Sequence, residues 1–268
     1  MISIGTTFNY DIALKDQLPM IKEAGFTHIS LGARIEHSGY LAVNGRKNIR
    51  RFLVGNGLSV CSVHTPFGKD LDISSPRRDI SDTTVDSYKR CIDAAADLSA
   101  HVVIFHPTAY LCSDHIEMRK ESLVKSVEKL LDHVGGTTVR LAVENDSFGP
   151  ANDVLVHSLD EIEDTRYGFC YDSSHDNLVE KPLVLLRKCR KRLLTTHISD
   201  NHGEKDDHML PFEGSYDWDG FCEIMSRVSF EGVLLLEVET RESAFGSPEK
   251  FLHEAFTRGE KLRKACRK

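Results

Sequence analysis

The sequence predicts an α/β fold, in which eight strand–helix units close into a single-domain (β/α)8 barrel. Short β-rich runs alternate with amphipathic stretches of helical period along all 268 residues, a pattern typical of parallel sheets covered by helices. Eight units share the chain at about 34 residues each, which is the size of one βα unit. No Gly-rich phosphate-binding loop follows the first strand, and this disfavours the alternative of an open, doubly wound sheet.

Composition supports one domain over residues 1–268. The chain is 40% hydrophobic and 28% charged, and no linker or change of composition divides it. No apolar segment has the length of a membrane span and no signal peptide is recognisable, so a cytoplasmic location without a membrane partner is expected. The net charge of −7 disfavours a partner held through a phosphate backbone. Seven scattered cysteines without a C-x-x-C motif indicate reduced thiols: Cys61, Cys91, Cys112, Cys170, Cys189, Cys222 and Cys266.

Eight β-rich runs predict the strands of the barrel. The fourth is continuously apolar, as is typical of a strand that is buried on both faces. The predicted strands are residues 2–6, 27–31, 58–64, 102–107, 139–144, 168–172, 193–199 and 233–238.

Amphipathic stretches between these strands predict helices. Residues 17–24 form a helix that Gly25 ends, and residues 46–54 form a second one. Asp82 is predicted to cap a third helix, because apolar side chains follow it at spacings of three and four that share one helix face.

Two later helices carry their own start signals. Asp114 and Glu117 have the spacing of a capping box, and Ser247 followed by Pro248 predicts the start of the last helix. The last helix ends in a cluster of basic residues that suits the helix dipole and that we interpret as a solvated face: Lys261, Arg263, Lys264, Arg267 and Lys268.

Six consecutive strands, from the third to the eighth, each end in His, Asp or Glu. The carboxyl ends of barrel strands converge on one mouth, so these side chains are expected to face one another. At a single strand end such a residue is equally well explained by a chain that leaves the core. Six in a row, none of them Lys or Arg, favour a shared function: His64, His106, Glu144, Asp172, His197 and Glu237.

A polar loop after the seventh strand adds further candidates. Residues 196–208 contain three His and four acidic side chains, which a divalent cation would satisfy and which would otherwise repel one another. The alternative is a flexible, solvated acidic loop. Asp206 and His208 lie in this loop, and His175 follows Asp172 by three residues. Spacing alone does not exclude three other residues from the same roles as Asp206, His208 and His175. These alternative candidates are Asp200, His202 and Asp207.

With these motifs the chain resembles the xylose isomerase-like TIM barrels, the AP endonuclease family 2. The resemblance covers nearly the whole chain. The motifs that carry it are Val63-His64-Thr65-Pro66, Phe105-His106-Pro107, Val143-Glu144-Asn145, Asp172-Ser173-Ser174-His175, His197-Ile198-Ser199-Asp200, and Asp206-Asp207-His208 continuing through Pro211 and Gly214 to Asp217-Trp218.

The resemblance implies a metal site, in one of two forms. In sugar isomerases and epimerases of this family, residues matching Glu144, Asp172, His197 and Glu237 hold one Mn or Mg ion. The two glutamates there also act as acid and base. In the endonuclease IV branch, three zinc ions are held by the residues matching His64, His106, Glu144, Asp172, His175, His197, Asp206, His208 and Glu237. All nine residue types are present here.

Departures from the endonuclease pattern favour the first branch. Residues 6–11 replace the Gly- and Ser-rich turn that contacts DNA, and residues 32–40 contain one Arg and no basic hook. Arg34, His37 and Lys69 could contact a phosphate, but we interpret each as a surface residue.

The prediction is therefore a metal-dependent isomerase or epimerase of a sugar or sugar phosphate. It works by proton transfer between Glu144 and Glu237, with one to three divalent ions (Mn, Mg or Zn) and without nucleic acid as a partner. The alternative is an endonuclease IV-like trinuclear zinc phosphodiesterase. A barrel that only binds a ligand is disfavoured by the intact ligand set. The exact substrate, the number and identity of the metals and the oligomeric state stay open.

Overall fold

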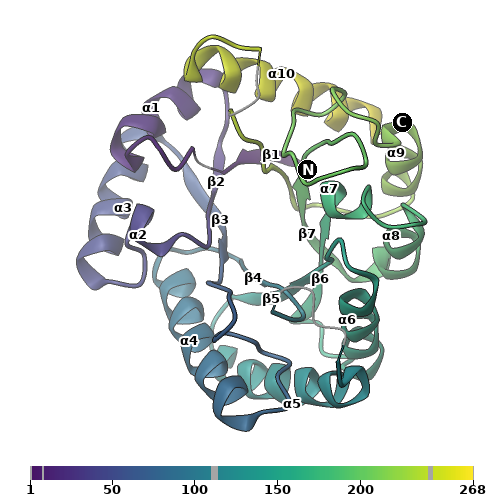
Figure 1. Ribbon diagram of the computed structural model, residues 1–268. Coiled ribbons are helices and arrows are strands. Elements are labelled where there is room, and N and C mark those ends of the chain that lie inside the picture. Colours follow the sequence, from purple (N-terminus) through teal and green to yellow (C-terminus); the bar gives the residue numbers. More distant parts are fainter. Residues whose placement is uncertain (1, 8, 110–113, 241–243, 268) are drawn as a thin grey trace.

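Eight parallel strands form a closed barrel with helices around its outside (Figure 1). The computed structural model describes residues 2–7, 9–109, 114–240 and 244–267. Each strand pairs with the next in sequence order, and β8 returns to pair with β1. The predicted (β/α)8 barrel is confirmed.

All eight predicted strands are present, with ends within two residues of those predicted. The strands are β1 (Ser3–Thr6), β2 (His28–Leu31), β3 (Ser59–His64), β4 (Val102–Phe105), β5 (Arg140–Glu144), β6 (Tyr167–Asp172), β7 (Leu193–Ile198) and β8 (Val233–Leu236). The helices are α1 (Leu14–Ala24), α2 (Ile35–Ser38), α3 (Val43–Asn56), α4 (Arg78–Asp97), α5 (Ile116–Val134), α6 (Gly149–Glu161), α7 (Ser173–Asp176), α8 (Val184–Cys189), α9 (Trp218–Ser226) and α10 (Pro248–Ala265), with a 3-10 turn at Arg190–Arg192.

Two of the predicted helix ends are confirmed by their backbone geometry. Gly25 ends α1 with φ 111°, a left-handed conformation that favours glycine. Ser247 caps α10, because its side chain accepts a hydrogen bond from the backbone N–H of Lys250.

Two predicted helix starts are wrong. Helix α4 begins at Arg78, so Asp82 lies inside it, and its carboxylate pairs with Lys129 at 2.6 Å. Helix α5 begins after His115, whose φ is 57°, and its first turn has no side-chain cap, so Asp114 and Glu117 form no capping box. In both cases a side chain that suits a helix cap forms an ion pair instead. Like Asp82, Glu117 pairs with a lysine, Lys120, at 2.7 Å.

Strand periodicity carries the predicted site residues into the barrel. Val102, Ile104, Ala142 and Cys170 form a separate apolar cluster in the barrel interior, apart from the larger core between the sheet and the helices. Side chains two positions apart on a strand point to the same face. Glu144 and Asp172 each lie two residues after one of these interior positions, and so their side chains are carried to the interior at the mouth.

The described cysteines are all buried and none forms a disulfide; Cys112 lies outside the described residues, as does Lys268 at the basic end of α10. Among the described helices, none combines the length and apolar character needed to cross a membrane.

Candidate functional site

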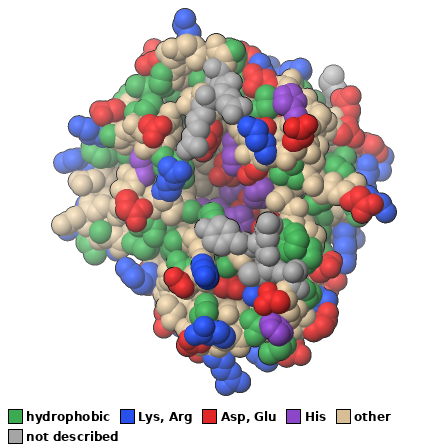
Figure 2. All heavy atoms as spheres, viewed as in Figure 1, with side chains coloured by type: hydrophobic (Ala, Val, Ile, Leu, Met, Phe, Trp, Pro, Cys, Tyr) green, Lys and Arg blue, Asp and Glu red, His purple; other side chains and the backbone are tan. Residues whose placement is uncertain are grey.

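The predicted site residues meet in one cavity of about 210 Å³ at the mouth of the barrel. Figure 2 shows the hollow, with histidine and acidic side chains gathered inside it. Eight of the nine predicted residues line it, and Asp172 lies buried behind them, in direct strand register with His197. These eight residues are His64, His106, Glu144, His175, His197, Asp206, His208 and Glu237.

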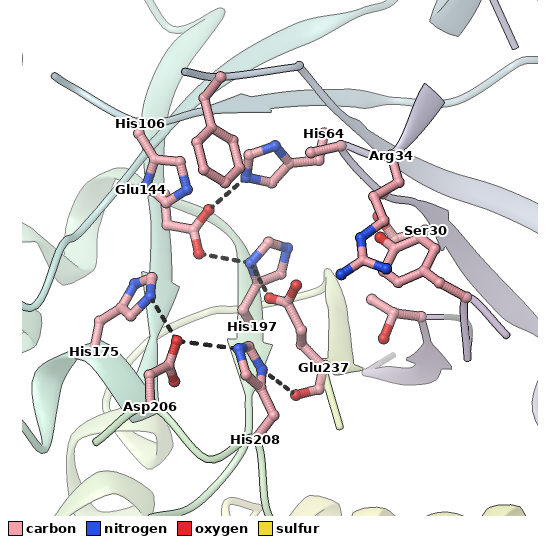
Figure 3. Close-up of a pocket in the computed structure, with 15 residues that line it drawn as sticks. Ser30, Arg34, His64, His106, Glu144, His175, His197, Asp206, His208 and Glu237 are labelled. Atoms are coloured by element: carbon pink, nitrogen blue, oxygen red, sulfur yellow. Dashed lines mark hydrogen bonds and ion pairs between the residues drawn. The ribbon is translucent and has the colours of Figure 1, made fainter. Parts of the chain in front are cut away.

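Four of these residues form a compact group, which we call the carboxylate cluster: Glu144, Asp172, His197 and Glu237. One donor atom from each lies within 4.8 Å of all the others. The His197 Nδ1 atom is 2.7 Å from Glu144 Oε1, 2.8 Å from Glu237 Oε2 and 4.0 Å from Asp172 Oδ2 (Figure 3). A single imidazole N–H thus faces three carboxylates, which repel one another in a buried site.

The carboxylate cluster fits a divalent cation. Asp172 Oδ2 is buried and makes no hydrogen bond, although a carboxylate oxygen that is removed from water needs a partner. Three carboxylates and one imidazole are a donor set suited to Mn or Mg, and also to Zn. These four residues are the ones that would hold the ion.

Burial and neighbouring charges act in opposite directions on these carboxyl groups. Burial would raise the pKa of Glu144, but the charge of His197 and hydrogen bonds from His197 and His64 hold it well below its usual value. Burial would also raise the pKa of Glu237, but the charge of His197 and the hydrogen bond with it lower this pKa to about 2. Asp172 accepts a hydrogen bond from the His175 backbone N–H at 2.7 Å but none from a histidine side chain, and burial raises its pKa to about 7.

His64 and His106 extend the site on the side of β3 and β4. The His64 Nε2 atom is 3.1 Å from Glu144 Oε2, and its Nδ1 atom is 2.7 Å from the Thr65 carbonyl oxygen. Burial lowers the pKa of His106 to about 3, so this imidazole is neutral and able to bind a metal. Glu144 thus uses one oxygen toward His197 and the other toward His64, which places it between two possible ion positions.

A second group lies on the other side, and we call it the loop cluster: His175, Asp206 and His208. Asp206 Oδ2 lies 3.3 Å from His175 Nε2 and 3.1 Å from His208 Nε2. Each Nδ1 atom lies close to a backbone carbonyl oxygen, at 2.8 Å from Asn145 for His175 and at 2.9 Å from Glu237 for His208. A ring that donates from Nδ1 in this way presents Nε2 to a ligand, as metal-binding histidines do.

The backbone at His208 supports a functional role for this loop. Its φ is 49°, a left-handed conformation that is costly for a residue with a side chain. The Glu239 N–H donates to the His208 carbonyl at 2.9 Å and helps to hold it. Such conformations persist where the surrounding structure enforces them, and they are frequent at ligand sites.

The rival loop residues have other tasks. Asp200 is buried and accepts hydrogen bonds from the Phe212 N–H at 3.0 Å and from the Trp218 indole at 2.9 Å. Asp207 pairs with Lys205 at 2.7 Å, and His202 is exposed. None of the three lines the cavity. Asp200 is therefore a structural residue that shapes the loop around the site.

Sequence reasoning missed how Asn145 supports the site. Its side-chain Oδ1 accepts from the Asp172 N–H at 2.7 Å, and its Nδ2 donates to the Asp172 carbonyl at 2.8 Å. The side-chain amide thus continues the hydrogen bonding between β5 and β6 beyond their ends, beside Glu144 and Asp172. The signal was an Asn directly after a strand-end Glu.

Arg34 is exposed, as predicted for a surface residue, but it also borders the cavity. It lines the cavity from the loop after β2, near Ser30 of β2 (Figure 3). Tyr10 and Gly32 also line the cavity. His37, from the same segment, packs edge-on against Tyr10 with ring centroids 5.2 Å apart, and Lys69 lines a different cavity. An isolated Arg in a loop carries no periodic signal that could have placed it.

The chain matches the family described as xylose isomerase-like TIM barrel over residues 18–262. It is 30% identical over 254 residues to the uncharacterized protein y4fM of Sinorhizobium fredii, an alignment that covers 85% of this chain and 82% of that protein.

Solved structures share the fold. A D-tagatose 3-epimerase-like protein has a TM-score of 0.82 at 19% identity, covering 98% of this chain and 97% of the other. The IOLI protein, solved with a bound zinc atom, has a TM-score of 0.79 at 15% identity, covering 99% and 98%. Other neighbours are also described as sugar epimerases.

Proposed function

The chain belongs to the xylose isomerase-like TIM barrel family, and we propose that it is a divalent-metal-dependent isomerase or epimerase of a sugar or sugar phosphate. The observation that carries this proposal is the approach of Glu144 and Glu237 to the same atom, His197 Nδ1, from two different strand ends. Structural neighbours that are described as sugar epimerases support the same class of reaction.

The carboxylate cluster would hold the ion. When bound there, a divalent ion supplies a Lewis acid that polarises the substrate carbonyl and stabilises the negative charge that develops on its oxygen. The chain itself supplies the acid and base groups and the enclosure.

The two glutamates move the proton. One carboxylate removes the proton from the carbon next to the carbonyl; the C–H electron pair forms a carbon–carbon double bond and the carbonyl oxygen takes the negative charge. A proton that returns from the other glutamate to the opposite face of the same carbon inverts its configuration. Return of the proton to the former carbonyl carbon, together with transfer of the hydroxyl proton of the first carbon to the oxyanion, makes the first carbon the new carbonyl and gives the isomer instead.

The size and the polarity of the cavity suit a small polyol. At about 210 Å³ it is below the range of roughly 300–1,000 Å³ that is usual for drug-sized ligands. The hydroxyl groups of a sugar can donate hydrogen bonds to the carboxylates that line the cavity and accept hydrogen bonds from its imidazole N–H groups. Phe67 adds an apolar wall, with its ring centroid 4.8 Å from that of His106.

Proton exchange with solvent tests the proposal. Protein loaded with Mn is incubated in heavy water with D-fructose, D-tagatose, D-fructose 6-phosphate or D-fructuronate, and the proton signals next to the carbonyl are followed by NMR. We expect metal-dependent incorporation of deuterium at that carbon. An absence of exchange, together with salt-sensitive nicking of an abasic-site duplex, would instead support the endonuclease alternative.

A further inference from the structure

Arg34 differs from the other charged residues of the cavity. The other charged groups that line it are acidic or histidine side chains, and no other Lys or Arg of the described chain contributes to it. Figure 3 shows the guanidinium of Arg34 pointing into the cavity, on the side where Glu237 lies. A permanent positive charge at this place calls for an explanation, because arginine stays protonated at any physiological pH.

The guanidinium of Arg34 makes no hydrogen bond and no ion pair with another described residue, although acidic side chains line the same cavity. The buried Arg119 and the half-buried Arg258, by contrast, are both paired. Arg119 donates to Asp72 at 2.6 Å, and Arg258 donates to Glu254 at 2.7 Å and to the Pro211 carbonyl at 3.0 Å. The donors of Arg34 are therefore available to a ligand.

Tyr10 positions this guanidinium. The Arg34 Cζ atom lies 4.6 Å from the centroid of the Tyr10 ring, a cation–π contact that helps to hold the guanidinium at the cavity. His37 packs edge-on against the same ring and its Nε2 atom lies 2.7 Å from the Ile12 carbonyl oxygen. A Cβ added at Gly32 would overlap the Tyr10 hydroxyl, so the absence of a side chain there lets Tyr10 lie where it does.

We propose that Arg34 binds a terminal oxyanion of the substrate, a phosphate or a carboxylate, and that the natural substrate is therefore an anionic sugar. This inference rests on the proposed function for the chemistry at the other end of the cavity. The planar N–H edge of a guanidinium matches two oxygens of either anion.

The charges of the cavity orient such a substrate. Glu144 and Asp206 repel an oxyanion from their part of the cavity, and Arg34 attracts it to the β2 side. The carbonyl end is then left facing the carboxylate cluster. Burial raises the pKa of the Tyr10 phenol to about 12, so the ring beside the anion stays neutral.

The test compares matched ligands with matched variants. D-Fructose, D-fructose 6-phosphate and D-fructuronate differ in the group at one end of the same carbon skeleton, and binding of each is measured by calorimetry alongside proton exchange. Arg34→Met removes the charge while it keeps an unbranched side chain, and Arg34→Lys keeps a charge without the planar edge. Lys15→Met, an exposed lysine on α1, is the control for loss of one positive charge.

We expect the wild type to bind at least one anionic sugar about 10- to 100-fold more tightly than D-fructose, which corresponds to hydrogen bonds to a charged group. Arg34→Met should remove this preference, because it should weaken binding of the anionic sugar far more than binding of D-fructose. Arg34→Lys should keep part of the preference, and Lys15→Met should keep all of it. A preference for phosphate over carboxylate, or the reverse, identifies the anion.

Two results would overturn the inference: equal affinity of the wild type for all three sugars, or equal loss of affinity for all three in Arg34→Met. The same measurements distinguish failure of the proposed function from failure of the anion subsite. If the wild type binds the anionic form through Arg34 but exchanges no proton, the subsite stands and the reaction is a different one. If it exchanges protons of D-fructose and of the anionic sugars equally well, the reaction stands and the subsite does not.

Discussion

The carboxylate cluster and the loop cluster lie in the same cavity but are held in different ways. Glu144, Asp172 and His197 belong to barrel strands, and the Asp172 side chain is 0% exposed. Asp206 stands on a loop and its side chain is 31% exposed, fixed by Ser174 Oγ, which donates to Asp206 Oδ1 at 2.6 Å. Strand hydrogen bonds thus fix three of the four residues of the carboxylate cluster, whereas Asp206 depends on side-chain contacts for its position. The carboxylate cluster is thus suited to chemistry that needs fixed positions, and the loop cluster to adjustable binding.

The largest effect should come from the glutamates of the carboxylate cluster. Glu144→Gln and Glu237→Gln each keep the shape of the side chain but remove its ability to accept a proton. We expect proton exchange to fall by factors on the order of 10²–10⁴ while the circular dichroism spectrum stays native. Glu204→Gln, on an exposed position of the loop after β7, serves as the control. Turnover close to that of the wild type in either glutamate variant would rule out the two-glutamate mechanism.

Removal of divalent ions should both abolish activity and destabilise the fold. Without an ion, the three carboxylates within 4.8 Å of His197 lose their main compensation. At an ion concentration about 100 times the Kd, binding is worth about 2.7 kcal/mol, so chelation should lower the Tm by roughly 5–10 °C. Differential scanning calorimetry with and without a chelator measures this. Asp172→Asn should lose most of the ion-dependent shift, and a Tm of the wild type that does not respond to chelation would argue against the site.

The loop cluster should show a smaller and metal-specific effect. With Zn supplied, we expect anomalous scattering at the zinc edge to show one ion in the carboxylate cluster and at least one beside it. Asp206→Asn should weaken the flanking ion about 10- to 100-fold and leave the first in place. A single peak in the wild type, with His175 and His208 turned away from Asp206, would mean that the loop cluster is not a metal site.

The smallest effect is expected from Asp200, the structural acid of the same loop. Asp200→Asn weakens hydrogen bonds from the Phe212 N–H and the Trp218 indole, and this should cost about 1 kcal/mol in the free energy of unfolding. Urea denaturation measures the cost, and metal analysis should show an unchanged ion content. Loss of an ion in this variant would instead indicate that Asp200 is a metal ligand.

The same contrast explains what the sequence could predict. Strand-end residues such as Glu144 were found because apolar runs fix where a strand ends and period two fixes where its side chains point. Asp114 failed as a helix cap because cap residues are common and the backbone before α5 takes a left-handed turn that no pattern signals. That Arg34 borders the cavity could not be predicted, because its position depends on how a loop packs against Tyr10, and such contacts between distant residues leave no local pattern.

The return of β8 to β1 has a consequence for how the chain folds. A chain synthesised only as far as β7 carries Glu144, Asp172 and His197 but ends the sheet in open edges, which invite pairing with other chains. Arrival of β8 covers both edges at once, through its pairing with β7 and β1, and delivers Glu237 as the fourth donor. An ion held by all four donors would bind the closed barrel more tightly than any open form, and it would therefore stabilise the product of the last folding step.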